Sequence, residues 1–133
     1  MNNPPSFMMS SLYVAAGGGL GAWLRYLVAR LWGVSGGTAA FPFATLTVNV
    51  LGSFAMGLLA GWLARFGTHG ESWRLLLGVG LLGGFTTFSA FSLELVNMIN
   101  RGAWGAAGSY VALSLVGGIA GLLAGLAVVR GLA

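Results

Sequence analysis

Apolar residues run along the chain in four long blocks that short polar segments separate. Each block has close to the roughly 20 residues that a helix needs to cross the hydrocarbon core of a bilayer. The separating segments, at 33–41, 66–72 and 101–104, hold the glycine, serine, threonine, histidine and arginine that are typical of turns. The pattern predicts a single all-α membrane domain over 1–133, with transmembrane helices at about 12–32, 42–65, 73–100 and 105–129 and a short polar lead-in at 1–11.

The third block contains a stretch that weakens a helix at the expected depth of the membrane centre. Residues 83–91 read GGFTTFSAF, and glycine and β-branched threonine both disfavour helix. Backbone that is not helical at this depth is tolerated only where it is buried in protein or lines a cavity. The block is also longer than one span needs. We therefore predict that the third helix is broken at its centre, at 83–87, and that the break marks a site for an ion or substrate.

The composition excludes several classes of protein. With 57% hydrophobic and 6% charged residues, the chain differs from soluble domains, in which about a quarter of the residues are charged. The formal charge of +4 comes from scattered arginines that form no basic patch, so a nucleic-acid partner is not expected. Cysteine is absent, and the one histidine, His69, cannot build a zinc site by itself. No credible Ser/His/Asp set is present, so we do not expect an enzyme.

The arginines divide almost equally between the two expected sides of the membrane. Because cytoplasmic loops normally carry an excess of positive charge, an even division leaves the orientation unspecified. The side of both termini would hold Arg65, Arg74 and Arg130, with Glu71, and the opposite side would hold Arg30, Arg101 and, deeper in its helix, Arg25. No internal repeat supplies inverted symmetry within one chain. We therefore predict insertion in both orientations and an antiparallel, dual-topology homodimer.

Tryptophans and glycines support the four-helix arrangement. Tryptophans at both membrane interfaces form the expected aromatic belts, with Trp32 and Trp104 at one and Trp62 and Trp73 at the other. Glycines spaced by four residues let helix backbones approach closely. The ladders are Gly117, Gly121 and Gly125 in the last helix, Gly57 and Gly61 in the second, and Gly17 and Gly21 in the first.

Polar side chains recur every fourth residue on two of the helices. They are Thr45, Asn49 and Ser53 on the second helix and Tyr110 and Ser114 on the fourth. Burying the amide N–H donors of Asn49 without partners would cost on the order of a few kcal/mol. A hydrogen bond between helices is one interpretation, and the lining of a polar pore is the other. Two parallel stripes beside a broken helix favour the pore.

Four further residues bear on transport. Phe88 and Phe91 lie on one helical face. Such stripes are usually core, but the positive edge of an aromatic ring can also face a dehydrated anion. Arg25 lies about two turns inside its helix, where it can snorkel to the interface or attract anions to a pore mouth. Glu94 lies near a helix end, where it caps or pairs. The absence of a carboxylate near the middle of any helix argues against proton-driven transport.

Taken together, these residues resemble the Fluc (CrcB-type) fluoride channels of bacteria over essentially the whole chain. The matching segments are GGGLGA at 17–22 with Arg25 and Tyr26, TL at 45–46, VN at 48–49, GSF at 52–54 with Gly57, and GGFTTFS at 83–89 with Phe91 and Glu94. The last of these segments is long and unusual in composition, and it gives the resemblance most of its specificity. Two positions depart from the family pattern: Ala90 where threonine is common, and Gly118 where serine is common.

The resemblance implies a four-helix subunit of the bacterial inner membrane that pairs as an antiparallel homodimer with two fluoride pathways. It implies passive export of fluoride from the cytoplasm, and a structural Na⁺ held at the dimer centre by the backbone carbonyls of Gly83 and Thr86. Phe88 and Phe91 would present ring edges to each pathway, and Asn49 would donate to fluoride. The remaining pathway residues would be Thr45, Ser53, Tyr110 and Ser114, with Arg25 at the vestibule.

Two other functions stay open at the level of sequence. A small dual-topology multidrug/proton antiporter would have a similar size, but it would need a carboxylate deep in a helix, and Glu94 lies near an end. A membrane scaffold protein without transport would not need polar stripes that face a broken helix.

Overall fold

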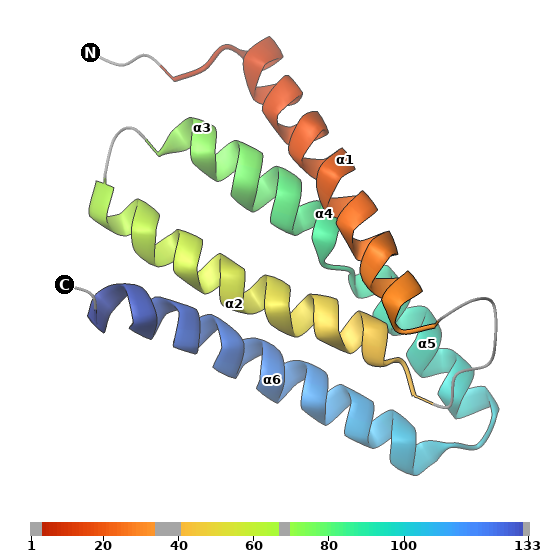
Figure 1. The fold of residues 1–133 in the computed structure, drawn as a ribbon. Helices are drawn as coiled ribbons and strands as arrows, with labels where there is room; N and C mark the ends of the chain where they lie inside the picture. The colour runs from red at the N-terminus through yellow and green to blue at the C-terminus, as the bar shows by residue number, and fades with distance from the viewer. Residues whose placement is uncertain (1–3, 34–40, 67–69, 132–133) are drawn as a thin grey trace.

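The computed structural model describes residues 4–33, 41–66 and 70–131, and all regular structure within them is helical (Figure 1). The elements are α1 (Phe7–Leu31), α2 (Phe43–Phe66), α3 (Glu71–Trp73), the π-helix η2 (Arg74–Leu82), α4 (Gly83–Phe85), α5 (Phe88–Asn100) and α6 (Trp104–Gly131). Four segments are long and apolar enough to cross a membrane: Phe7–Leu31, Phe43–Arg65, Glu71–Asn100 and Trp104–Gly131. His69 lies outside the described residues.

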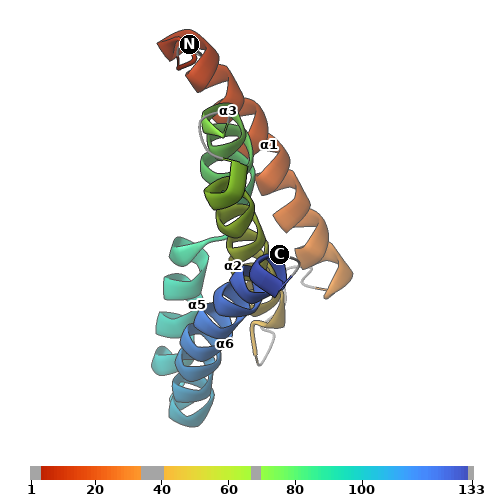
Figure 2. The same ribbon diagram turned by 90° about the vertical axis from the view of Figure 1, so that its left-hand side faces the viewer.

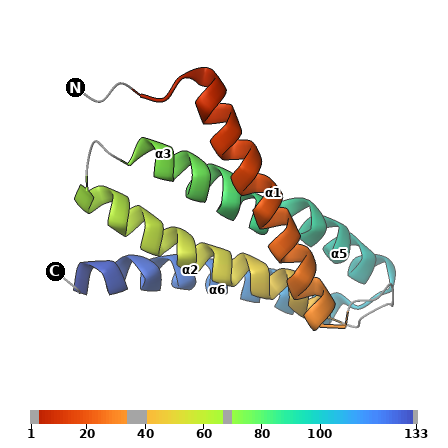
Figure 3. The ribbon, with the colours of Figure 1, turned by 45° about the horizontal axis from the view of Figure 1, so that its top comes forward.

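The helices lie side by side in a narrow row. Figure 1 shows the order α1, η2, α2 and α6 across this row, with the start of α1 and the end of α6 at the same end of the molecule. In the perpendicular view of Figure 2, α5 is displaced sideways from the line of α3 and lies beside α6. Figure 3 shows α1 crossing over the region where the third segment passes from α4 to α5. This region is therefore enclosed by α1 on one side and α2 on the other.

The first helix begins earlier than the hydropathy pattern predicts. α1 starts at Phe7 rather than at Leu12, because Ser6 caps it: the Ser6 Oγ accepts a hydrogen bond of 3.4 Å from the backbone N–H of Met9. A serine that follows two prolines and precedes good helix formers is a normal helix start. Residues 7–11 of the segment expected as a polar lead-in therefore belong to α1.

Glycines determine which helices pack closely. A Cβ added at Gly57 of α2 would meet the carbonyl oxygen of Leu122 on α6, and one added at Gly125 of α6 would meet that of Phe54 on α2. Any larger residue at either position would push the two backbones apart. The glycine ladders of the second and last helices are thus confirmed as packing surfaces. They hold α2 and α6 together along most of their length.

The first half of the third segment is a π-helix that packs on α1. Its nine residues, Arg74–Leu82, form wider turns than an α-helix, and the N–H of Gly83 bonds to the carbonyl of Gly78, five residues earlier. π-helical segments are rare and usually short. Gly17 and Gly21 of α1 lie directly against the backbone of this segment, where a Cβ on either would clash with a carbonyl oxygen. The apolar pattern of the sequence does not predict this change of helical period.

The helix is interrupted at two threonines and not at the glycine pair. α4 ends at Phe85 and α5 begins at Phe88, and Thr86 (φ −79°, ψ 158°) and Thr87 (φ −152°, ψ 122°) between them have extended backbone. Gly83 and Gly84, expected within the break, belong to α4. A Cβ at Gly84 would meet the carbonyl of Gly18, so this glycine allows close approach of α1 rather than loosening the helix.

Candidate functional site

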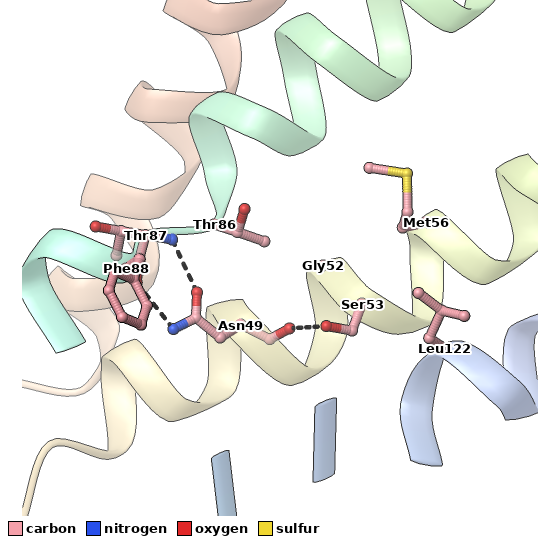
Figure 4. A pocket seen from close by; sticks show the side chains of 8 residues that line it. All are labelled: Asn49, Gly52, Ser53, Met56, Thr86, Thr87, Phe88 and Leu122. Atoms are coloured by element: carbon pink, nitrogen blue, oxygen red, sulfur yellow. Dashed lines mark hydrogen bonds between the residues drawn. The ribbon is translucent and has the colours of Figure 1, made fainter. Parts of the chain in front are cut away.

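A groove opens beside the interruption. It has a volume of about 300 Å³ and is lined by Asn49, Gly52, Ser53, Met56, Thr86, Thr87, Phe88 and Leu122; we refer to it as the Asn49 groove. Figure 4 shows the Asn49 amide pointing at the backbone of Thr87, with the ring of Phe88 beside it and Leu122 approaching from α6. None of these eight residues carries a charge. The groove therefore offers neutral hydrogen-bonding groups between apolar walls.

Asn49 holds the interrupted backbone in place. Its Nδ2 donates a 3.0 Å hydrogen bond to the carbonyl of Thr87, and its Oδ1 accepts a 2.8 Å bond from the N–H of the same residue. The side chain thereby replaces the helical partners that extended backbone loses. The amide nitrogen carries two hydrogens, so one N–H remains beyond the bond to Thr87. Asn49 thus makes the hydrogen bond between helices that was one of the two interpretations, and it also lines the groove.

The interruption leaves backbone carbonyls at the end of α4. The N–H of Thr87, which would bond to the carbonyl of Gly83 in a continuous α-helix, bonds to Asn49 instead. The carbonyl of Thr86 accepts a long, 3.5 Å bond from Nη1 of Arg25. A helix C-terminus carries partial negative charge, and oxygen atoms are the ligands that hard cations prefer. Of the two carbonyls that the family resemblance implies as Na⁺ ligands, that of Gly83 has lost its helical donor and that of Thr86 accepts from Arg25, so Arg25 lies against the interruption.

The side chain of Thr86 fills the space above a glycine of α2. Its hydroxyl donates to the carbonyl of Leu82 at 2.9 Å, and its methyl group lies where a Cβ on Gly52 would be. The hydroxyl of Thr87 accepts from the N–H of Ala90 at 3.2 Å and so caps the start of α5. Both threonines are therefore fixed by local bonds, and the interruption has a single defined path.

The two phenylalanines of the motif lie in different surroundings. Their ring centroids are 5.7 Å apart, but Phe88 is 79% exposed, whereas Phe91 is partly buried and packs on Tyr110 with centroids 4.9 Å apart. Phe88 lines the Asn49 groove and Phe91 does not. Phe88 is therefore available to a partner or an ion, while Phe91 belongs to the core that α5 and α6 share.

Glu94 binds two hydroxyl groups that the sequence did not connect to it. Thr45 donates to its Oε1 and Tyr110 to its Oε2, each at 2.7 Å. Thr45 and Tyr110 are both buried, so the carboxylate is fixed between α2 and α6. Glu94 pairs with neutral donors. We refer to Glu94, Thr45 and Tyr110 as the Glu94 cluster. Each donor lies in one of the polar stripes, and this is the one signal by which the sequence could have suggested the cluster.

A second groove runs along α6. It has a volume of about 340 Å³ and is lined by Ser53, Ser114, Leu115, Gly118, Ile119, Leu122 and Leu123; we refer to it as the Ser114 groove. The Oγ of Ser114 is buried and has no hydrogen-bond partner among the described residues. The Oγ of Ser53 donates to the carbonyl of Asn49 at 2.7 Å. The polar stripe of the fourth helix is thus divided, with Tyr110 in the core and Ser114 in this groove.

The sequence is similar to many proteins of one family. The chain is 54% identical to a fluoride-specific ion channel FluC of Novosphingobium aromaticivorans over 127 residues, which are 95% of this chain and 100% of the relative. It is 54% identical to a protein of the same name from Rhodospirillum centenum over 123 residues, and 52% identical to one from Caulobacter vibrioides over 128 residues; each match covers 92% of this chain and 97% of the relative.

A family comparison gives the same assignment. The model for "CrcB-like protein, Camphor Resistance (CrcB)" matches residues 12–126, which include both grooves, the interruption and the Glu94 cluster. The matched region and the relatives both span nearly the whole chain, so the similarity is not limited to one motif. Together with four helices long enough to cross a bilayer, it identifies a multi-pass membrane protein. The chain belongs to the CrcB-like family.

Proposed function

We propose that this protein is a fluoride-selective channel that lets fluoride leave the cytoplasm passively. The observation that carries the proposal is the Asn49 groove, where an amide, two threonines and an exposed phenylalanine ring meet at an interrupted helix. The proposal is supported by relatives that are named fluoride-specific channels and are at least half identical over nearly their full length. These relatives are ion channels by name and not enzymes.

The lining chemistry suits a small, strongly hydrated anion. A pore must replace the hydration shell of the ion and yet release the ion again. The second N–H of Asn49, the hydroxyl of Ser114 and the ring edge of Phe88 are all donors without a fixed charge. An arginine in the groove would hold the anion more tightly. Arg25 donates to the carbonyl of Thr86, which lines the Asn49 groove, but Arg25 itself lines neither groove.

The working unit that we propose is an antiparallel homodimer in which the third span is discontinuous. One protomer leaves long apolar faces open: Phe88 of α5 is 79% exposed, and Val116 and Ile119 of α6 are more than 60% exposed. Lipid or a second copy can cover such faces. The arginines at the ends of the helices are balanced, which permits both orientations. A second copy in the opposite orientation would close the grooves, which are open in one protomer.

The proposed antiparallel homodimer would also complete a cation site. Two carbonyls from one protomer, those of Gly83 and Thr86, are few ligands for a hard cation, and two copies would supply four. A Na⁺ ion bound there would offset part of the electrostatic cost of bringing an anion to this depth. We place the protein in the bacterial inner membrane. Fluoride that entered the cell as neutral HF and ionised inside would leave through the channel down its own gradient.

An efflux assay tests the function. The purified protein is reconstituted in liposomes loaded with fluoride or chloride, and release is followed with ion-selective electrodes. Fluoride release without chloride release, and without any need for a proton gradient, is expected. A requirement for a proton gradient would favour an antiporter. Absence of flux would favour a scaffold, and equal chloride flux would exclude fluoride selectivity.

A further inference from the structure

The two grooves meet at one polar side chain. Ser53 of α2 and Leu122 of α6 line both the Asn49 groove and the Ser114 groove. Leu122 is apolar, so Ser53 is the only hydrogen-bonding side chain that the two linings share. An ion that passes from one groove to the other within this protomer would therefore pass the hydroxyl of Ser53.

The hydroxyl of Ser114 is a donor that has no acceptor within the described residues. Its oxygen is buried, and a buried hydroxyl without a partner is unfavourable, so native structures rarely keep one without a ligand or an ordered water. Apart from the two serines, the Ser114 groove is lined by glycine and leucine or isoleucine, none of which offers a side-chain acceptor. An anion in the groove would accept the O–H of Ser114 directly.

The hydroxyl of Ser53 can join it. Its present bond runs to the carbonyl of Asn49 in its own helix, four residues earlier. Such a local bond is weak and competes with other partners, so the hydroxyl can exchange it for a better acceptor. Gly118 of α6 lies opposite Ser53 where the two grooves meet, and a Cβ added at Gly118 would be 3.5 Å from the Oγ of Ser53. The α6 backbone is bare at this point, and the hydroxyl of Ser53 faces the space that a side chain at 118 would occupy.

We infer that the hydroxyl groups of Ser53 and Ser114 together bind fluoride where the two grooves meet. In this binding site, Ser53 of α2 supplies the donor that α6 lacks at Gly118. The inference rests on the proposed function and adds a site to it. Hydroxyl groups from two helices replace two water molecules of the hydrated ion without introducing charge. The ion would move between this binding site and the Asn49 groove as the Ser53 hydroxyl turns from the Asn49 carbonyl to fluoride and back.

A double-mutant cycle tests the pairing of Ser53 with position 118. In otherwise wild-type protein, Ser53→Ala is expected to lower fluoride efflux about 10-fold. In a Gly118→Ser background the same change is expected to cost less than about 2-fold, because the hydroxyl introduced at position 118 takes over the role of Ser53. The 3.5 Å spacing is an ordinary contact, so this serine fits without displacing α2. Equal losses in the two backgrounds would overturn the inference, since independent sites give additive effects.

Further variants separate folding from binding. Ser11→Ala is the matched control, because Ser11 also donates to the carbonyl four residues earlier, that of Phe7, but lies outside both grooves. It should leave efflux and fluoride-dependent thermal stabilisation unchanged. Ser114→Ala is the second variant if Ser53→Ala does not fold, and it should lose that stabilisation and about 10-fold in efflux. Wild-type behaviour of Ser114→Ala would refute the site while leaving the channel function intact. Absence of fluoride efflux from the wild type would refute both.

Discussion

Replacing Asn49 by leucine would remove both hydrogen bonds that hold Thr87 in its extended conformation, at 2.8 and 3.0 Å. Thr87 is buried, so its N–H and C=O would lose their partners without gaining bulk water. Each buried backbone group left unsatisfied costs about 1–2 kcal/mol. Because leucine has a similar volume, little packing is lost, and the free energy of unfolding should fall by ~2–4 kcal/mol, from two such groups. Fluoride efflux should also be lost, because leucine offers no donor.

A second substitution separates the two roles of Asn49. Asn49→Asp keeps an acceptor for the N–H of Thr87 and removes the donor to its carbonyl, so the loss from hydrogen bonds is smaller, at ~1–2 kcal/mol for one group. An ionised carboxylate beside that carbonyl adds a separate electrostatic cost. It also places a carboxylate in a groove that we propose for an anion, so efflux should be abolished. The two variants should therefore match in transport and differ in stability.

The stability assay is reversible unfolding in mixed detergent micelles, followed by tryptophan fluorescence, with liposome efflux measured in parallel. Asn97→Leu is the matched control, because Asn97 is exposed on α5 and lies outside both grooves. A loss below ~0.5 kcal/mol for Asn49→Leu would mean that its hydrogen bonds do not hold the interruption. Wild-type efflux in both variants would remove Asn49 from the pathway.

Four further predictions concern the ion pathway, the helix packing, the proposed cation site and the membrane topology. Phe88→Ala should lower fluoride efflux with little loss of protomer stability, whereas Phe7→Ala, a change at a similarly exposed ring, should alter neither. Gly57→Ala should destabilise the protein by ~1–3 kcal/mol, because its Cβ meets the Leu122 carbonyl. Gly108→Ala, with open space around it, is the control and should not destabilise the protein. Equal melting temperatures of the two variants would contradict this packing. Replacing Na⁺ by a large organic cation should lower dimer stability, and an unchanged dimer would exclude the cation site. Gly105→Cys in this cysteine-free chain, at an exposed position with open space around it, should be labelled from both sides of the membrane, and labelling from one side would exclude dual topology.

The sequence contained the location of the site but not its contacts. Residues 83–91 stood out because their composition disagrees with the helix around them, and the interruption falls within this stretch. The interruption covers only Thr86 and Thr87 of the predicted 83–87, because the glycines pack against α1 and remain helical while the two threonines become extended. The sequence does not distinguish a glycine that allows close helix contact from a glycine that breaks a helix. Only the neighbouring backbone distinguishes them.

Hydropathy is a sum over neighbouring residues, so the chain's four apolar blocks were enough to predict an all-helical membrane protein with spans near the observed ones. The tertiary structure alone decided which polar groups meet: Asn49 with Thr87, Thr45 with Glu94, and Arg25 with the carbonyl of Thr86, pairs that lie 38, 49 and 61 residues apart. Such pairs depend on how closely and at what angle the helices approach. That approach is set by glycine contacts and by the wider turns of η2, which no local pattern of apolar residues records.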